Sequence, residues 1–112
     1  MTIQQRDVGN VVVLDIDGKL MGGMDSELFQ ETVQQLISAG RQRILVNLEK
    51  VKWMNSTGLG ILIAGYQATQ RNGGTLKLLN VSDRIQDLLK ITKLSSVFES
   101  YDAEAEAVES FA

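Results

Sequence analysis

Apolar and polar positions along the chain repeat with two different periods, and each period predicts one kind of element. Within the β-branched run of residues 11–17, three apolar side chains share one face and Asp15 and Asp17 share the other. This alternation predicts a strand with one solvated face. The Gly-Asn pair just before it is a favoured two-residue turn, so residues 2–8 are expected to pair with this strand as a hairpin.

The rest of the pattern predicts four helices and three further strands. Apolar residues recur at helical spacing in four segments: residues 25–39, 57–71, 82–91 and those from about 102 onward. Short apolar runs rich in β-formers predict three strands: residues 43–48, 75–80 and 97–99. The expected order of elements is therefore ββαβαβαβα.

Polar and small residues predict where the helices end and which faces make contacts. Asp25 or Ser26 is expected to cap the first helix and Ser82 the third, whereas Gly40 and the Asn-Gly-Gly sequence at 72–74 end the first two. Small residues at positions 60, 64 and 68 predict that one face of the second helix lies close to the sheet. The apolar stripe expected on the last helix consists of Tyr101, Ala105, Val108 and Phe111.

Alternating strands and helices require crossover connections, which produce parallel strand pairs with helices packed against the sheet. The sequence therefore predicts an α/β fold with one domain over residues 1–112. Its sheet is expected to be mixed but mostly parallel, with four to five strands and about four helices.

Composition narrows the classes of function. The 112 residues include no histidine and no cysteine, which excludes Ser-His-Asp and Cys-His catalysis and a zinc site of sulfur and nitrogen ligands. The net charge is −3, and the basic residues are scattered rather than gathered in one run, so nucleic-acid binding is not expected. The acidic last fourteen residues are interpreted as a solvated helix face. We expect a protein that is not an enzyme.

Other motifs for chemistry fail on their spacing. The sequence from Asp15 to Lys19 begins like a calcium loop, but its glycine comes two positions early and Lys19 stands where a ligand oxygen is needed. Asp15 and Asp17 could also pair as acid and base, but acids on an outward strand face are usually only solvated. The pair of glycines at 58 and 60 lacks the third glycine of a dinucleotide fingerprint, because position 63 is isoleucine. No metal and no cofactor is expected.

The location of the protein is expected to be cytoplasmic. Residues 1–7 show no basic region leading into an apolar one, as a signal peptide would. The longest uncharged run, residues 53–70, is interrupted by polar side chains and contains no apolar stretch approaching the ~20 residues of a membrane span. Direct insertion into a membrane is therefore not expected.

The segment Val51–Gly60, between an apolar strand and an apolar helix, is the one motif that remains as a candidate functional site. Ser56 lies at or one residue from the helix N-cap, where a hydroxyl can accept a hydrogen bond from an unpaired backbone amide. The positive end of the helix also tolerates an anion such as a phosphate. The alternative interpretation is that Ser56 and Thr57 only cap the helix and that Gly58 and Gly60 permit close packing.

At this motif the sequence resembles the STAS-domain family, in particular the bacterial anti-sigma-factor antagonists. Their hallmark is an acid-Ser-Ser/Thr-Gly-Leu-Gly turn at the start of the second helix, and its first hydroxyl residue is phosphorylated by a partner kinase. The resemblance covers nearly the whole chain and includes the strand residues Val46 to Leu48 with the following Val51 and the Gly-Lys-Leu before the first helix. Two positions depart from the family: Asn55 replaces the usual Asp, and Met21 stands where Asp is frequent.

The resemblance implies a regulatory switch. The unphosphorylated protein would bind an anti-sigma factor that is also a serine kinase, and the sigma factor would thereby be freed. Phosphorylation on Ser56 would dissociate this complex. A serine phosphatase is a further partner that such a switch can use. Expected partner contacts are Met21, Met24, Asn55, Ser56, Thr57, Gly58 and Leu59. Trp53 and Met54 are further apolar candidates, although Trp53 and Leu59 could instead be core residues. The alternative function is a constitutive STAS subunit that docks on a larger signalling or membrane-associated complex without phosphorylation.

Overall fold

The computed structural model describes residues 1–112 and contains one five-stranded sheet in the order β1-β2-β3-β4-β5. The strands are β1 (Thr2–Val8), β2 (Val11–Leu20), β3 (Arg43–Met54), β4 (Thr75–Leu79) and β5 (Ser100–Tyr101). The helices are α1 (Met24–Ser38), α2 (Ser56–Arg71), α3 (Asp83–Ile91) and α4 (Glu104–Glu109). β1 is antiparallel to β2 and every other pair is parallel, so the predicted order and the mixed, mostly parallel sheet are confirmed.

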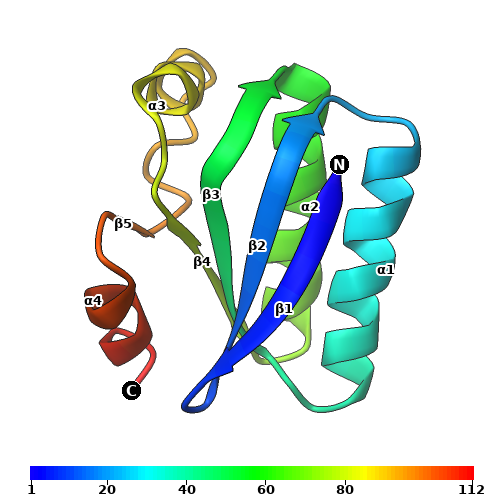
Figure 1. The fold of residues 1–112 in the computed structure, drawn as a ribbon, viewed down its shortest axis with the longest axis vertical. Helices are drawn as coiled ribbons and strands as arrows, with labels where there is room; N and C mark the ends of the chain where they lie inside the picture. Colours follow the sequence, from blue (N-terminus) through cyan, green and yellow to red (C-terminus); the bar gives the residue numbers. More distant parts are fainter.

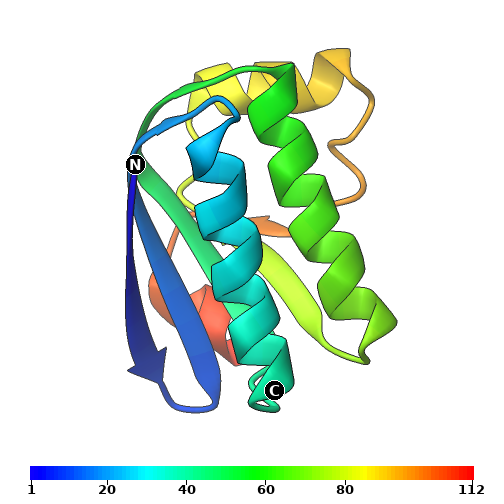
Figure 2. The same ribbon diagram turned by 90° about the vertical axis from the view of Figure 1, so that its right-hand side faces the viewer.

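The helices cover the two faces of the sheet unequally. Figure 1 shows α1 and α2 on one side of the sheet, α4 on the opposite side, and α3 at the end of the sheet where β3 finishes. In Figure 2 α1 and α2 stand side by side in front of the sheet. A cluster of 21 buried residues fills the space beneath α1 and α2, and a cluster of five lies beneath α4. No helix is long and apolar enough to cross a membrane.

The predicted solvated face of β2 is only partly solvated. Val11 and Val13 lie on the same face as Asp15, yet their exposed fractions are 2% and 0% because α4 covers this part of the sheet. The buried contact on α4 is Ala107, whereas the predicted Ala105 is exposed. The single-faced interpretation of β2 was therefore wrong at its beginning, and the consecutive valines reflect burial on both faces.

β3 runs six residues beyond its predicted end at residue 48. Its pairing with β2 shifts twice, between Asp15 and Asp17 and again between Gly18 and Lys19, so an extra β3 residue bulges out at each shift. A bulge breaks the period-two alternation from which a strand is read. The strand predicted from the sequence therefore ended at the first bulge of β3. The part of β2 that pairs beyond this bulge, up to Leu20, was not predicted either.

Two predictions about helix ends and faces were wrong. α1 begins at Met24 with Gly23 as its N-cap and no side-chain cap, so neither Asp25 nor Ser26 caps it. On α2 the close contact is made by Gly65, where a Cβ would lie 2.6 Å from the ring of Phe29 on α1. Gly60 is exposed and a Cβ there would meet nothing within 4 Å. The predicted cap of α3 is confirmed, because the Ser82 hydroxyl accepts from the amide of Ile85 at 3.3 Å.

Candidate functional site at the start of α2

The start of α2 is held by Asn55, the one residue between β3 and the helix. Its backbone is extended, with φ of −110°, and its side-chain Oδ1 accepts a hydrogen bond from the Gly58 amide at 2.8 Å. Its own carbonyl accepts from the Leu59 amide at 2.9 Å. Asn55 is therefore the N-cap, and the expectation that the Ser56 hydroxyl could do this is corrected.

Because Asn55 supplies the cap, the hydroxyls that follow it are left free. Ser56 and Thr57 occupy the first two positions of α2, and both residues are exposed. Neither hydroxyl makes a hydrogen bond within the protein, in contrast to those of Thr69 and Thr92, which donate to backbone carbonyls four residues earlier. Ser56 thus presents an unengaged nucleophilic oxygen at a helix N-terminus.

Two glycines hold this helix start against the end of β2. A Cβ on Gly58 would lie 1.8 Å from the carbonyl oxygen of Leu20, so α2 and β2 touch backbone to backbone. A Cβ on Gly22, whose φ is +113°, would lie 2.9 Å from the methyl group of Thr57. The loop between β2 and α1 is consequently packed onto the first turn of α2, and Thr57 faces that loop.

Exposed apolar side chains lie at the same end of the molecule as the two hydroxyls. Met21 and Met24, from the loop before α1 and its first residue, are 44% and 85% exposed. Trp53, near the end of β3, is 50% exposed, and the guanidinium carbon of Arg84 on α3 lies 4.2 Å from its ring centroid. Figure 1 shows the ends of β2 and β3 and the start of α2 at one end of the molecule. The exposed methionines and tryptophan therefore share that end with Ser56.

Three of the residues considered as partner contacts are buried. Leu59 and Met54 are 2% and 9% exposed and belong to the core beneath α1 and α2, and Gly58 is buried against β2. Gly58 and Leu59 help to fix the helix start. Trp53, by contrast, is half-exposed. The alternative interpretation of Trp53 as a core residue was therefore wrong.

The α2 helix itself contributes no negative charge near its start. α2 has no acidic residue in its first turn, and its cap is a neutral amide. An α-helix carries a partial positive charge at its N-terminus, which here no carboxylate of the same helix offsets. A phosphate on Ser56 would meet no like charge from α2.

The acidic pair Asp15 and Asp17 lies elsewhere, on the sheet face beside α4. Arg6 donates to Asp15 at 2.5 and 3.0 Å and to Glu104 at 2.6 Å, and Asn47 donates to Asp15 at 2.8 Å. The hydrogen bonds from Arg6 hold the pKa of the Asp15 carboxyl below its usual value, with a smaller contribution from Asn47. Asp15 therefore stays ionised as part of a link between β1, β2, β3 and α4. No group of three or more His, Cys, Asp or Glu side chains could hold a metal ion.

Sequence reasoning allowed Asn55 as a cap but did not choose between it and Ser56. It missed two features of this site, the contact between Gly22 and Thr57 and the stacking of Arg84 on Trp53. Both join residues more than thirty positions apart. No local pattern could have revealed them.

Comparison with known proteins places the chain in a family. The STAS domain family model matches residues 2–107, so the chain belongs to the STAS domain family. A relative in Bacillus subtilis (strain 168), an anti-sigma-B factor antagonist, is 31% identical over 88 residues, which cover 76% of this chain and 80% of the relative. The Staphylococcus aureus (strain NCTC 8325 / PS 47) protein of the same description is 40% identical over 68 residues, 61% of this chain. That alignment spans 63% of the S. aureus protein's length, a little under two thirds.

Solved structures show the same fold. A crystal structure of a candidate anti-sigma factor antagonist from Thermotoga maritima superposes with a TM-score of 0.88 at 24% identity, covering 97% of this chain and 93% of that one. The Bacillus cell fate determinant SpoIIAA in its phosphorylated form gives a TM-score of 0.76 at 22% identity, covering 99% of this chain and 100% of that chain. At these identities the likeness concerns the fold alone.

Proposed function

We propose that this protein is an anti-sigma-factor antagonist whose binding is controlled by phosphorylation of Ser56. In the unphosphorylated form it binds an anti-sigma factor that is also a serine kinase, and so frees the sigma factor. Phosphorylation by that kinase releases the complex, and a serine phosphatase restores binding, all within the cytoplasm. The descriptions of the two relatives support the first step. The observation that carries the switch is the free, exposed Ser56 hydroxyl at the first position of α2.

The fold supports a phosphate at Ser56 without unfolding. The cap that starts α2 is made by Asn55 and Gly58, so modifying the Ser56 hydroxyl removes no hydrogen bond of the helix. The partial positive charge of the helix N-terminus favours the added anion. Phosphorylation therefore changes the surface of the domain and leaves its core in place.

The same phosphate is unfavourable in a complex. It adds a charge of roughly −1.5 to −2 at neutral pH. The Ser56 hydroxyl lies at the same end of the molecule as the exposed Met21, Met24 and Trp53, which suit a partner surface that is apolar around a neutral group. A charged phosphate would have to lose its water against that surface, so the complex loses affinity.

Two variants of Ser56 test the switch. Ser56→Ala should bind the kinase partner persistently, whereas Ser56→Asp should bind it weakly, and both should fold like the parent because the exposed Ser56 hydroxyl makes no hydrogen bond within the protein. Thr57→Ala is the matched control, because it removes the hydroxyl next to Ser56, to which the switch assigns only a supporting role. Calorimetric titration of each variant with the partner measures the effect. Equal affinities of the Ala and Asp variants at position 56 would refute the switch.

A second candidate is a constitutive STAS interaction subunit of a larger signalling or membrane-associated complex. It is favoured by Asn55 and Met21, which stand where the family often carries Asp. In this structure Asn55 still caps α2, so the substitution removes a charge and keeps the hydrogen bond.

Phosphopeptide mapping of residues 51–71 after incubation with ATP and host lysate separates the two functions. Phosphate on Ser56 supports the switch. Phosphate mainly on Thr57 shows that the phosphorylation site of the family was assigned to the wrong residue of this chain. Repeated absence of phosphate in a lysate with proven kinase activity favours the constitutive subunit.

A further inference from the structure

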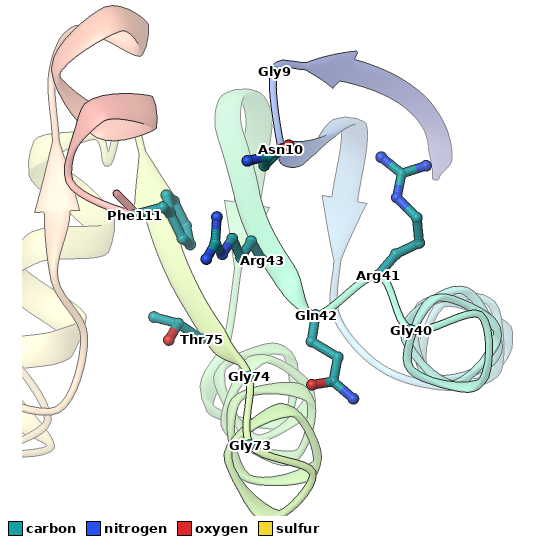
Figure 3. A pocket seen from close by; sticks show the side chains of 10 residues that line it. All are labelled: Gly9, Asn10, Gly40, Arg41, Gln42, Arg43, Gly73, Gly74, Thr75 and Phe111. Atoms are coloured by element: carbon teal, nitrogen blue, oxygen red, sulfur yellow. The ribbon is translucent and has the colours of Figure 1, made fainter.

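The largest hollow in the molecule lies at the end opposite Ser56. Its volume is about 800 Å³, and it is bounded by the β1–β2 turn, the loop between α1 and β3, the turn between α2 and β4, and Phe111 after α4. Figure 3 looks into this cleft, with the ends of α1 and α2 below it and the hairpin turn above. The whole length of β3, from Arg43 to Met54, separates the cleft from the start of α2.

The lining of the cleft is polar and positively charged. It includes Arg41 and Arg43 but no acidic residue, in a chain whose net charge is −3. The smaller hollow on the other side of Arg43 includes Glu109 and the C-terminal Ala112, but neither forms an ion pair with Arg43. Arg41 donates to Asp7 on β1 at 2.5 Å, and Figure 3 shows its side chain directed toward β1. Arg43 is exposed and makes no hydrogen bond or ion pair within the protein, and in Figure 3 it lies between Asn10 and Phe111. One arginine thus serves the fold and the other is available to a ligand.

Neutral donors accompany Arg43. The side chains of Asn10, Gln42 and Thr75 also line the cleft, and none of them forms a hydrogen bond within the protein. Each carries at least one polar hydrogen that can be donated to an anion. Asn10 lies on the same side as Arg43, since both also line the smaller hollow beside Phe111, whereas the Gln42 side chain points to the opposite face of the sheet (Figure 3).

The walls of the cleft are fixed by backbone contacts. The Thr75 amide donates to the Gln42 carbonyl at 2.8 Å, and a Cβ on Gly74 would lie 2.4 Å from that same oxygen. These two loops therefore touch backbone to backbone. The glycines of the lining are explained by such contacts and by positive φ values in the turns, as at Gly40 (+75°) and Gly73 (+81°). The unpaired Arg43 and its neutral neighbours are not explained by the fold.

We propose that this cleft binds a ligand carrying an oxyanion, a single phosphate or carboxylate group, held by the Arg43 guanidinium. The guanidinium presents a rigid fork of donors that matches two oxygens of either anion. Asn10 supplies a donor beside it, and the Phe111 ring forms one apolar wall for the rest of the ligand. Occupation of the cleft does not depend on the Ser56 switch.

Titrations of the ¹⁵N-labelled full chain at constant ionic strength test the proposal. The probes are inorganic phosphate and acetate, added separately, and the amide signals of Gly9, Asn10, Gly73 and Gly74 report on the cleft. Saturable shifts confined to these residues are expected, and Arg43→Gln should weaken binding about tenfold, as for the loss of a hydrogen bond to a charged group. Tighter binding of phosphate points to a phosphorylated ligand, and tighter binding of acetate to a carboxylate.

Two controls keep the result specific. Arg71→Gln removes an exposed arginine at the end of α2 that does not line the cleft, and it should leave the binding unchanged. Asn10→Ala keeps Arg43 but removes the neutral donor beside it, and it should weaken binding by a smaller factor than Arg43→Gln. Shifts that spread over the lysines and arginines of the whole surface, or that are the same in Arg43→Gln and the parent, overturn the proposal.

Discussion

Two glycines two residues apart on α2 are expected to respond to the same substitution with opposite signs. At Gly58 an alanine Cβ would stand 1.8 Å from the carbonyl oxygen of Leu20 and 3.2 Å from the Met54 side chain. At Gly60 it would meet nothing within 4 Å. Gly58→Ala and Gly60→Ala thus form a matched pair in the same turn of one helix.

The magnitude follows from what must move. At Gly58 the gap of 1.8 Å must open to at least the 3.4 Å of an ordinary van der Waals contact, and the obstacle is a backbone oxygen of the fully buried Leu20. We expect a loss of about 3 kcal/mol, the upper end of what overpacking usually costs. At Gly60 alanine only reduces the freedom of the unfolded chain and improves helix propensity, so stability should rise by about 0.5–1 kcal/mol.

Urea unfolding followed by far-UV circular dichroism measures both free energies, and thermal unfolding followed at the same wavelength measures the corresponding shifts in Tm. For a chain of 112 residues, 1 kcal/mol corresponds to a shift in Tm of about 4 °C. Gly58→Ala should therefore melt about 12 °C below the parent and Gly60→Ala about 2–4 °C above it. If Gly58→Ala is as stable as the parent, or if Gly60→Ala is the less stable of the two, the backbone contact between α2 and β2 has been placed wrongly.

Three further changes test other parts of the structure. Asn55→Ala should cost about 1 kcal/mol in urea unfolding through loss of the cap, while Asn55→Asp keeps the cap and should cost little. Arg6→Gln should lower the urea midpoint at neutral pH. The hydrogen bonds from Arg6 lower the pKa of Asp15 in the folded protein, so the ionised carboxylate stabilises the fold at any pH above the pKa of Asp15 in the unfolded chain, about 3.9. The difference from the parent should vanish as the pH falls well below that value. Leu59→Ala should cost about 2–5 kcal/mol as a core cavity, whereas the exposed Met24→Ala should change stability by less than about 0.5 kcal/mol. Equal losses for Leu59→Ala and Met24→Ala would contradict their assigned burial.

The order of elements and the location of the candidate site could be predicted from the sequence. Local periods of apolar residues and turn residues such as Gly40 act over a few positions, and the structure preserves them. The motif around Ser56 was equally local, since a strand, a cap and a helix start follow one another directly along the chain. The two bulges of β3 mark where this reasoning failed, because an inserted residue shifts the alternation on which a strand prediction depends.

The division of roles within the motif could not be predicted in the same way. Asn55, Ser56 and Thr57 are all plausible caps by residue type, and only the backbone at Asn55 decides which one accepts the hydrogen bond from Gly58. Similarly, Gly58 and Gly60 are alike in sequence but differ in what approaches them from β2. The free hydroxyl of Ser56 is a consequence of the cap at Asn55.

The sequence by itself determined the α/β class, the succession of strands and helices and the serine at the start of α2. The tertiary structure alone decided that α4 buries Val11 and Val13 and that Leu59 lies in the core. It also decided that Asn10, Arg43 and Gly74 meet in one cleft although they are about thirty residues apart in the chain. The physical reason is that hydrophobic periods and caps depend on neighbours in sequence. Burial and shared surfaces depend on which distant segments pack together.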